Sequence, residues 1–156
     1  MSVEKILKGH DLFRSLGIDE AHGISDYSSV KKYQANENIF QYNDRADHAY
    51  MLMKGSVLLR LPAEHQDISL IISRIEKGEL FGLSPLLDSS RYTATAQCRE
   101  ATEVLSIEAK PFKELLRQNC TVGFNIMNQV AQIYFSRYID VLKNIQRVVS
   151  QISFIR

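Results

Sequence analysis

The sequence predicts a mainly β fold, a double-stranded β-helix or jelly roll with flanking helices, followed by one long C-terminal helix. Two observations carry this prediction. Short apolar runs recur about every ten residues between residues 30 and 107, and Asn, Asp and Gly turns separate them, which is typical of a double-sheet jelly roll. After residue 107 that pattern stops, and apolar residues recur at helical spacing.

The N-terminal segment and the strand runs follow in that order. Between Val3 and Leu16 we expect two short helices, because Gly9 weakens the middle and Gly17 ends the pattern. Asn43 occupies a tight turn, where asparagine tolerates a positive φ, and Lys54-Gly55 makes the next reversal. The expected strands are residues 30–33, 39–42, 49–53, 57–61, 68–75, 93–98 and 103–107.

The helical part begins after the last strand. Pro111 is expected to open one helix, and Thr121 to cap the next. The last helix has an apolar a/d register of about four and a half heptads. A helix packed only on its own domain would explain the first turns alone, so we expect a parallel homodimeric coiled coil. The register comprises Phe124, Met127, Ala131, Tyr134, Tyr138, Val141, Ile145, Val148, Ile152 and Ile155, of which all but the first and last are the expected dimer interface.

Composition excludes several classes of protein. The chain has 156 residues and 45% hydrophobic content, enough for a buried core, and its net charge of +1 provides no basic field for DNA binding. No apolar run is long enough to span a membrane and the start is not a signal peptide, so we expect a cytoplasmic protein.

The sequence contains no recognisable metal-binding or catalytic motif. The two cysteines, Cys98 and Cys120, are too few for an iron–sulfur cluster unless subunits share ligands. No nucleophile, zinc-protease or Walker motif occurs, so we expect neither an enzyme nor a metal site. The histidines are scattered singly along the chain at His10, His22, His48 and His65.

The segment 78–97, GELFGLSPLLDSSRYTATAQ, contains a candidate anion pocket. Gly82 allows backbone N–H groups to turn inward, and a short helix at residues 84–87 would add its N-terminus. The segment resembles the phosphate-binding cassette of cyclic nucleotide-binding domains, Phe-Gly-Glu-Leu-Ala-Leu followed by Pro-Arg-Ala-Ala-Thr. The resemblance, including the turns and hairpins, covers about residues 12–145, and the motif Arg-Tyr-Thr-Ala-Thr-Ala-Gln is similar to the gas- and redox-sensing branch of the Crp/Fnr regulators.

Two polar anchors of that family are replaced in this chain. The glutamate that holds the ribose falls on Leu83, and the arginine that holds the cyclic phosphate falls on Tyr92. Arg91 either points to the opposite face, as a one-residue shift along a strand requires, or reaches the pocket through a local bulge. The resemblance implies ligand-binding roles for Phe81, Gly82, Leu83, Ser84, Arg91, Tyr92, Thr93, Tyr134 and Tyr138.

The dimer helix of this family passes the mouth of the pocket. The resemblance places Tyr134, Arg137 and Tyr138 there. The two tyrosines have two interpretations, dimer packing or ligand contact, whereas Arg137 is expected to be an interhelical surface charge. We divide the chain into residues 1–110, the N-terminal helices and sensor domain, and residues 111–156, the C-terminal helices with the coiled coil.

The resemblance implies a ligand-sensing regulatory domain of the Crp/Fnr type. We expect a small anionic or cyclic nucleotide-like effector, a homodimer, and DNA contact only through a winged-helix domain that this chain does not contain. The chain is then either the sensor part of a regulator or a stand-alone effector-binding protein. Two alternatives stay open: a haem-based gas sensor, which suits a less polar pocket, and a dimerisation module that binds no ligand.

Overall fold

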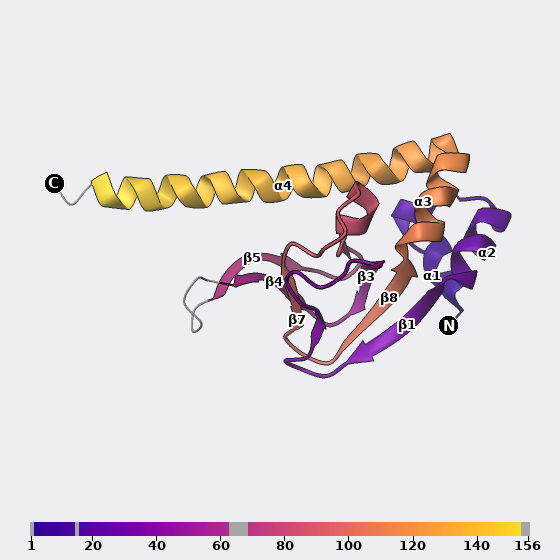
Figure 1. The fold of residues 1–156 in the computed structure, drawn as a ribbon, viewed down its shortest axis with the longest axis horizontal. Coiled ribbons are helices and arrows are strands. Elements are labelled where there is room, and N and C mark those ends of the chain that lie inside the picture. The colour runs from indigo at the N-terminus through magenta and orange to yellow at the C-terminus, as the bar shows by residue number, and fades with distance from the viewer. Residues whose placement is uncertain (1, 15, 63–68, 154–156) are drawn as a thin grey trace.

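The computed structural model describes residues 2–14, 16–62 and 69–153, and its strands form two antiparallel four-stranded sheets (Figure 1). The strand orders are β1-β8-β3-β6 and β2-β7-β4-β5. The jelly roll predicted from the spacing of the apolar runs is therefore confirmed. The strands are β1 (Ser28–Tyr33), β2 (Asn38–Phe40), β3 (His48–Lys54), β4 (Val57–Pro62), β5 (Ser69–Ile75), β6 (Leu80–Phe81), β7 (Thr95–Cys98) and β8 (Thr102–Glu108).

The strand β3 is buried on both of its faces. Tyr50 and Leu52 face the second sheet, whereas Ala49 and Met51 face a helical layer. Because successive side chains of a strand point to opposite faces, two separate cores alternate along β3. This arrangement explains why β3 reads as a continuous apolar run, Ala-Tyr-Met-Leu, instead of an alternating pattern.

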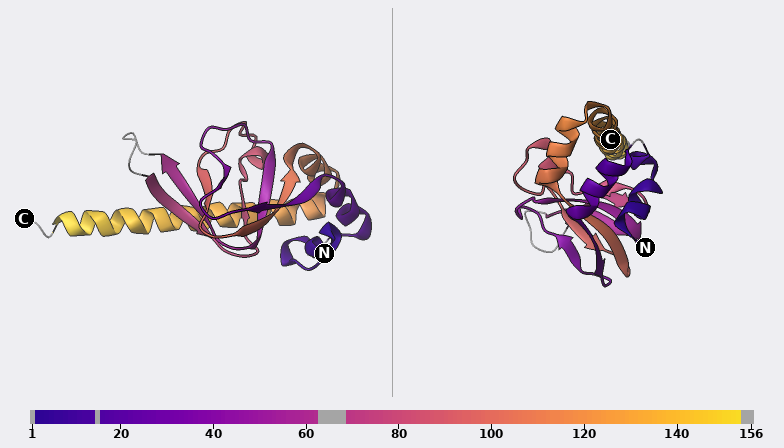
Figure 2. Two further views of the ribbon diagram at one scale, coloured as in Figure 1. Left: turned by 90° about the horizontal axis from the view of Figure 1, so that it is seen from below. Right: turned by 90° about the vertical axis from the view of Figure 1, so that its right-hand side faces the viewer.

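Helices cover the outer face of the sheet that contains β3 and one end of the jelly roll (Figures 1 and 2). The C-terminal helix, α4, then runs along the molecule and extends past the strands (Figure 1). None of the described helices is long and apolar enough to cross a membrane. The helical elements are α1 (Val3–Lys8), η1 (Asp11–Phe13), α2 (Ile18–Asp26), η2 (Ser84–Leu87), α3 (Ala109–Gln118) and α4 (Cys120–Ser153).

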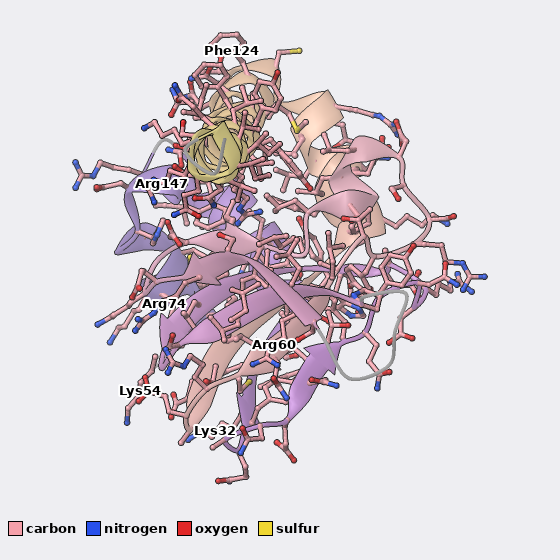
Figure 3. The ribbon with its side chains drawn as sticks, turned by 90° about the vertical axis from the view of Figure 1, so that its left-hand side faces the viewer. Lys32, Lys54, Arg60, Arg74, Phe124 and Arg147 are labelled. Carbon is pink, nitrogen blue, oxygen red and sulfur yellow. The ribbon has the colours of Figure 1, made fainter. Side chains whose placement is uncertain are left out.

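The two halves of α4 have different surroundings. Val122, Ile126 and Val130 are at most 2% exposed and pack into the core formed with the first sheet. Every residue from 141 to 152 is exposed. Figure 3 looks along α4 from its C-terminal end and shows Phe124 on the side that points away from the sheets.

Several expected boundaries are wrong. The second N-terminal helix is a single 3₁₀ turn, and α2 is an additional helix that the glycine-containing segment did not reveal. The helix expected to open at Pro111 begins at Ala109, since proline also fits within a first turn. The helix cap is Asn119 instead of Thr121, because the Asn119 side-chain oxygen accepts a hydrogen bond from the Val122 N–H at 3.2 Å.

The strand boundaries shift by a few residues. The strand expected at residues 93–98 begins at Thr95, and the one expected at residues 39–42 ends at Phe40. The predicted positive φ of Asn43 is confirmed at 69°, and Gly55 makes its turn at 94°. Ile68, His65 and Ile155 lie outside the described residues.

Candidate ligand-binding cavity

A cavity of ≈ 350 Å³ lies between the jelly roll and α4. This volume is in the range of small-molecule sites. Most of its wall is aliphatic or aromatic, with hydroxyl groups and one cation added. The lining residues are Phe40, Leu59, Leu61, Ile72, Gly82, Leu83, Ser84, Tyr92, Thr93, Ala94, Tyr134, Arg137, Tyr138 and Val141.

The turn that follows β6 forms part of the wall and depends on Gly82. Its φ is +63°, a left-handed conformation that favours glycine. A Cβ atom at this position would lie 2.8 Å from Tyr50 Cδ2 and 2.9 Å from Phe40 Cε1. The expected short helix is present as η2 (Ser84–Leu87), and its C-cap residue, Asp88, has a φ of +60°.

The two replaced anchor positions belong to the hydrophobic core. Leu83 is 2% exposed and packs on the helical side. Tyr92 is 4% exposed, and its ring stacks on Phe40 with centroids 3.9 Å apart. The Tyr92 hydroxyl donates a hydrogen bond to the His48 carbonyl at 2.7 Å, and burial raises the pKa of the phenol. Neither position places a charge in the cavity.

Arg91 lies on the surface, away from the residues that line the cavity. Its guanidinium Nη1 donates to the Asn43 carbonyl at 3.0 Å, and its backbone forms an isolated bridge with Arg45. Phe81 is also outside the cavity lining, since it is fully buried between the sheets with its ring centroid 5.4 Å from that of Tyr50. The structure brings the other expected ligand-binding residues together around the cavity: Gly82, Leu83, Ser84, Tyr92, Thr93, Tyr134 and Tyr138.

Arg137 was expected at the mouth of the pocket as an interhelical surface charge, and the structure places it in the cavity wall as a cation. Among the described residues that line the cavity, it is the only charged one. Its Nη2 donates a 3.4 Å hydrogen bond to the Leu80 carbonyl, and its guanidinium carbon lies 5.9 Å from the centroid of the Tyr134 ring. Burial lowers the pKa of the guanidinium. The one available signal was its position between Tyr134 and Tyr138, which places all three side chains near one face of α4.

Tyr134 and Tyr138 form the outer wall of the cavity. They are 37% and 58% exposed, so each presents part of its ring to the cavity and part to the outside. Burial raises the pKa of the Tyr134 phenol. The expected dimer positions further along α4 continue this exposed face, with Val141, Ile145 and Val148 at 41%, 54% and 56% exposure. Ile152 is exposed as well, as is Ala131, while Met127 is half-buried.

The cavity wall does not fit the usual protein ligands of haem. Axial ligands of haem iron are His, Cys, Met or, as in catalase, Tyr. The described lining residues include tyrosines but no His, Cys or Met. The four histidines of the chain are likewise placed elsewhere or fall outside the described residues. In the described part of the chain there is also no group of three His, Cys, Asp or Glu side chains that could hold a metal ion.

A larger and shallower groove of ≈ 480 Å³ lies on the other side of η2, against α3. Its acidic and basic groups neutralise one another, as where the Lys113 ammonium binds the Asp88 carboxylate. The groove also contains Asp47, Glu108, Lys110 and Arg117. Because opposite charges balance there and no anchor position of the cassette reaches it, the smaller apolar cavity is the stronger candidate site.

Comparisons with known proteins find a family model, related sequences and related folds. The family model of the cyclic nucleotide-binding domain matches residues 30–119. The cyclic AMP receptor protein of Thermus thermophilus is 29% identical over 127 residues, which cover 81% of this chain and 58% of that relative. The chain thus spans little more than half the length of this curated relative.

Two solved structures show the same fold. The sensor domain of the transcriptional regulator DNR from Pseudomonas aeruginosa superposes with a TM-score of 0.72 at 19% identity, covering 87% of this chain and 96% of that one. The catabolite activator protein of Thermus thermophilus superposes with a TM-score of 0.68 at 25% identity, covering 83% of this chain and 61% of that one.

Proposed function

Since this chain belongs to the cyclic nucleotide-binding domain family, we propose that it is a ligand-sensing regulatory domain of the Crp/Fnr type. It is the effector-binding part of a transcriptional regulator and carries no catalytic activity of its own. The similarity to the Thermus receptor protein and to bacterial regulator structures supports this role. The cavity between the jelly roll and α4 supplies the place for an effector.

The effector is not an ordinary cyclic nucleotide. The observation that carries this proposal is the burial of Leu83 and Tyr92, which occupy the ribose and phosphate anchor positions of the family cassette. A charge-assisted hydrogen bond contributes about 1.5–3 kcal/mol, so the loss of two costs about 3–6 kcal/mol. That loss weakens binding about 10²- to 10⁴-fold.

The signal passes through α4. The effector contacts Tyr134 and Tyr138, and the same helix continues into an exposed apolar stripe that pairs with a second copy of the chain. An effector that binds one arrangement of the paired helices better than another shifts their equilibrium. Output then requires a module that reads the arrangement of the paired helices.

Calorimetric titration with cyclic AMP and cyclic GMP tests the effector class. We expect dissociation constants above about 100 µM, for the reason of the missing anchors. Low-micromolar binding would contradict this expectation and would indicate that another cation holds the phosphate. In that event, Arg91→Ala and Arg137→Ala titrated beside Tyr92→Phe would identify the cation.

The sensing role itself is tested by a thermal-shift panel of cyclic mononucleotides, cyclic dinucleotides, 2-oxoacids, other carboxylates and haem. A sensor domain is stabilised by its effector in a concentration-dependent manner. If no compound in a broad panel shifts the melting temperature, a dimerisation module without a ligand becomes the better description.

A further inference from the structure

On the basis of the proposed sensing function, we propose that the effector is an apolar or aromatic monocarboxylate whose carboxylate is bound by Arg137 of α4. The cation that binds the anionic group is thereby on the helix α4. In the family pattern the corresponding cation is on the cassette, at the opposite wall of the cavity. Three features of the cavity carry this inference: its single cation, the incomplete pairing of that cation, and the apolar wall facing it.

Arg137 can accept an anionic partner. The Glu79 carboxylate is near enough to interact favourably with its charge, but no salt bridge joins Arg137 to a carboxylate of the described residues. Its hydrogen bond to the Leu80 carbonyl is long, at 3.4 Å. A guanidinium offers five N–H donors in a planar fork, so most of its donor capacity is open to a ligand. The neighbouring Tyr134 ring, 5.9 Å from the guanidinium carbon, limits its orientation without neutralising it.

The rest of the cavity selects an apolar body. Leu59, Leu61, Ile72 and Val141 contribute aliphatic surface, and the stacked rings of Phe40 and Tyr92 contribute an aromatic wall. The polar groups in this lining are the hydroxyls of Ser84, Thr93, Tyr134, Tyr138 and Tyr92. The Tyr92 hydroxyl is already used by His48. A ribose or a purine edge would leave several of its polar groups without partners, which costs about 1–3 kcal/mol for each one.

A carboxylate fits this cation better than a phosphate does. A planar carboxylate accepts two parallel hydrogen bonds from one guanidinium. A phosphate monoester carries up to two charges, and no second cation to balance them is among the described lining residues. A single carboxylate on an apolar body therefore matches the charge and the surface of the cavity together.

The test uses matched pairs of probes on the full chain. Phenylacetate is compared with phenylacetamide, and octanoate with octanamide, by ligand-detected NMR and calorimetry. Each pair keeps the apolar body and removes the charge. We expect at least one carboxylate to bind with a dissociation constant below about 1 mM, and its amide about 10- to 100-fold more weakly.

Variants assign this preference to one residue. Arg137→Gln should abolish the preference for carboxylate over amide, whereas Arg137→Lys, which keeps the charge, should retain part of it. Arg91→Gln is the matched control, because Arg91 is an exposed arginine outside the cavity; it should leave both affinities unchanged. Circular dichroism establishes that each variant is folded.

The outcomes separate this inference from the sensing function. Equal affinity for acid and amide, a preference that persists in Arg137→Gln, or no saturable binding of either carboxylate overturns the monocarboxylate inference. The sensing function survives any of these results if another compound in the thermal-shift panel binds and stabilises the protein. Tight cyclic AMP binding would instead overturn both this inference and the proposal that the effector is not a cyclic nucleotide.

Discussion

On the jelly-roll wall of the cavity, Leu83 and Tyr92 are 2% and 4% exposed, whereas on the α4 wall Tyr134 and Tyr138 are 37% and 58% exposed. The first wall is part of two hydrophobic cores, so its shape is set by the packing of the whole domain. The second wall belongs to a helix whose outer face is free. The sheets therefore fix one side of the cavity, and the proposed sensing function assigns the response to the more exposed α4.

The largest effect should come from charges on the exposed stripe of α4. Ile145→Glu combined with Val148→Glu would place unpaired charges in the proposed helix pair, which costs several kcal/mol per dimer. We expect a folded monomer in sedimentation, with the circular dichroism of the jelly roll retained. Lys143→Glu with Ser150→Glu, also exposed but off the stripe, is the matched control. If the unmodified protein sediments as a monomer at tens of micromolar, the proposed helix pair does not form, and signalling through paired α4 helices is wrong.

On the rigid wall, Gly82→Ala should lower the free energy of unfolding by about 2–4 kcal/mol. Two costs add: the left-handed φ of +63° and the contact of the new Cβ with Tyr50 and Phe40. Urea denaturation gives the difference. Gly23→Ala within α2 is the opposite control, because its Cβ would meet only Leu115 Cδ1 at 3.8 Å. That substitution should stabilise the protein by about 0.5–1 kcal/mol. If Gly82→Ala leaves the free energy of unfolding unchanged, the residues around Gly82 can rearrange and this wall is not rigid.

A pair of identical substitutions compares the two walls directly. Tyr92→Phe removes the hydroxyl that donates to the His48 carbonyl, and we expect a loss of about 0.5–1.5 kcal/mol in unfolding free energy. Tyr138→Phe, on the exposed wall, should change it by less than about 0.5 kcal/mol. The two measurements use the same denaturant titration, and equal losses would contradict the distinction between the walls.

The smallest effect concerns the charge contact that ties the end of η2 to α3. The Lys113 ammonium, through its hydrogen bond, lowers the pKa of the Asp88 carboxyl in the folded state. A lowered folded-state pKa stabilises the protein above the ordinary aspartate pKa and loses this contribution as the pH falls through the shifted value. We therefore expect Asp88→Asn to be slightly less stable than the unmodified protein at pH 7. The difference should disappear at low pH, and a difference that grows on acidification would exclude this origin.

Much of the jelly roll could be predicted because its signals are local. Asn43 and Gly55 mark turns by residue type, and the apolar runs between them have the length of strands. The helix α2 could not be predicted, since Gly23 interrupts its pattern and the burial of Ala21 and Ile24 depends on tertiary packing. The helix starts near Pro111 and Thr121 differ from the expected ones because both residues also fit inside a first turn. Their residue type therefore does not fix where the helix begins.

The candidate site was predictable in its backbone and not in its electrostatics. Gly82 and η2 were expected where the structure has them. The role of Arg137 could not be predicted from spacing. The heptad register identifies the residues that face a partner helix, and it carries no information on which residues face the jelly roll. The orientation of Arg91 depends on its backbone bridge to Arg45, a residue far away in sequence.

The uninterrupted course of α4 gives the molecule a lever arm. The helix is continuous from Cys120 to Ser153, and from Arg137 to its last described residue it rises about 24 Å. A tilt of about 5° at the cavity would displace that tip by about 2 Å, a distance comparable to helix shifts at known switching interfaces. If the proposed effector shifts the Arg137 guanidinium by a fraction of an ångström, this geometry would amplify the shift at the far end of α4.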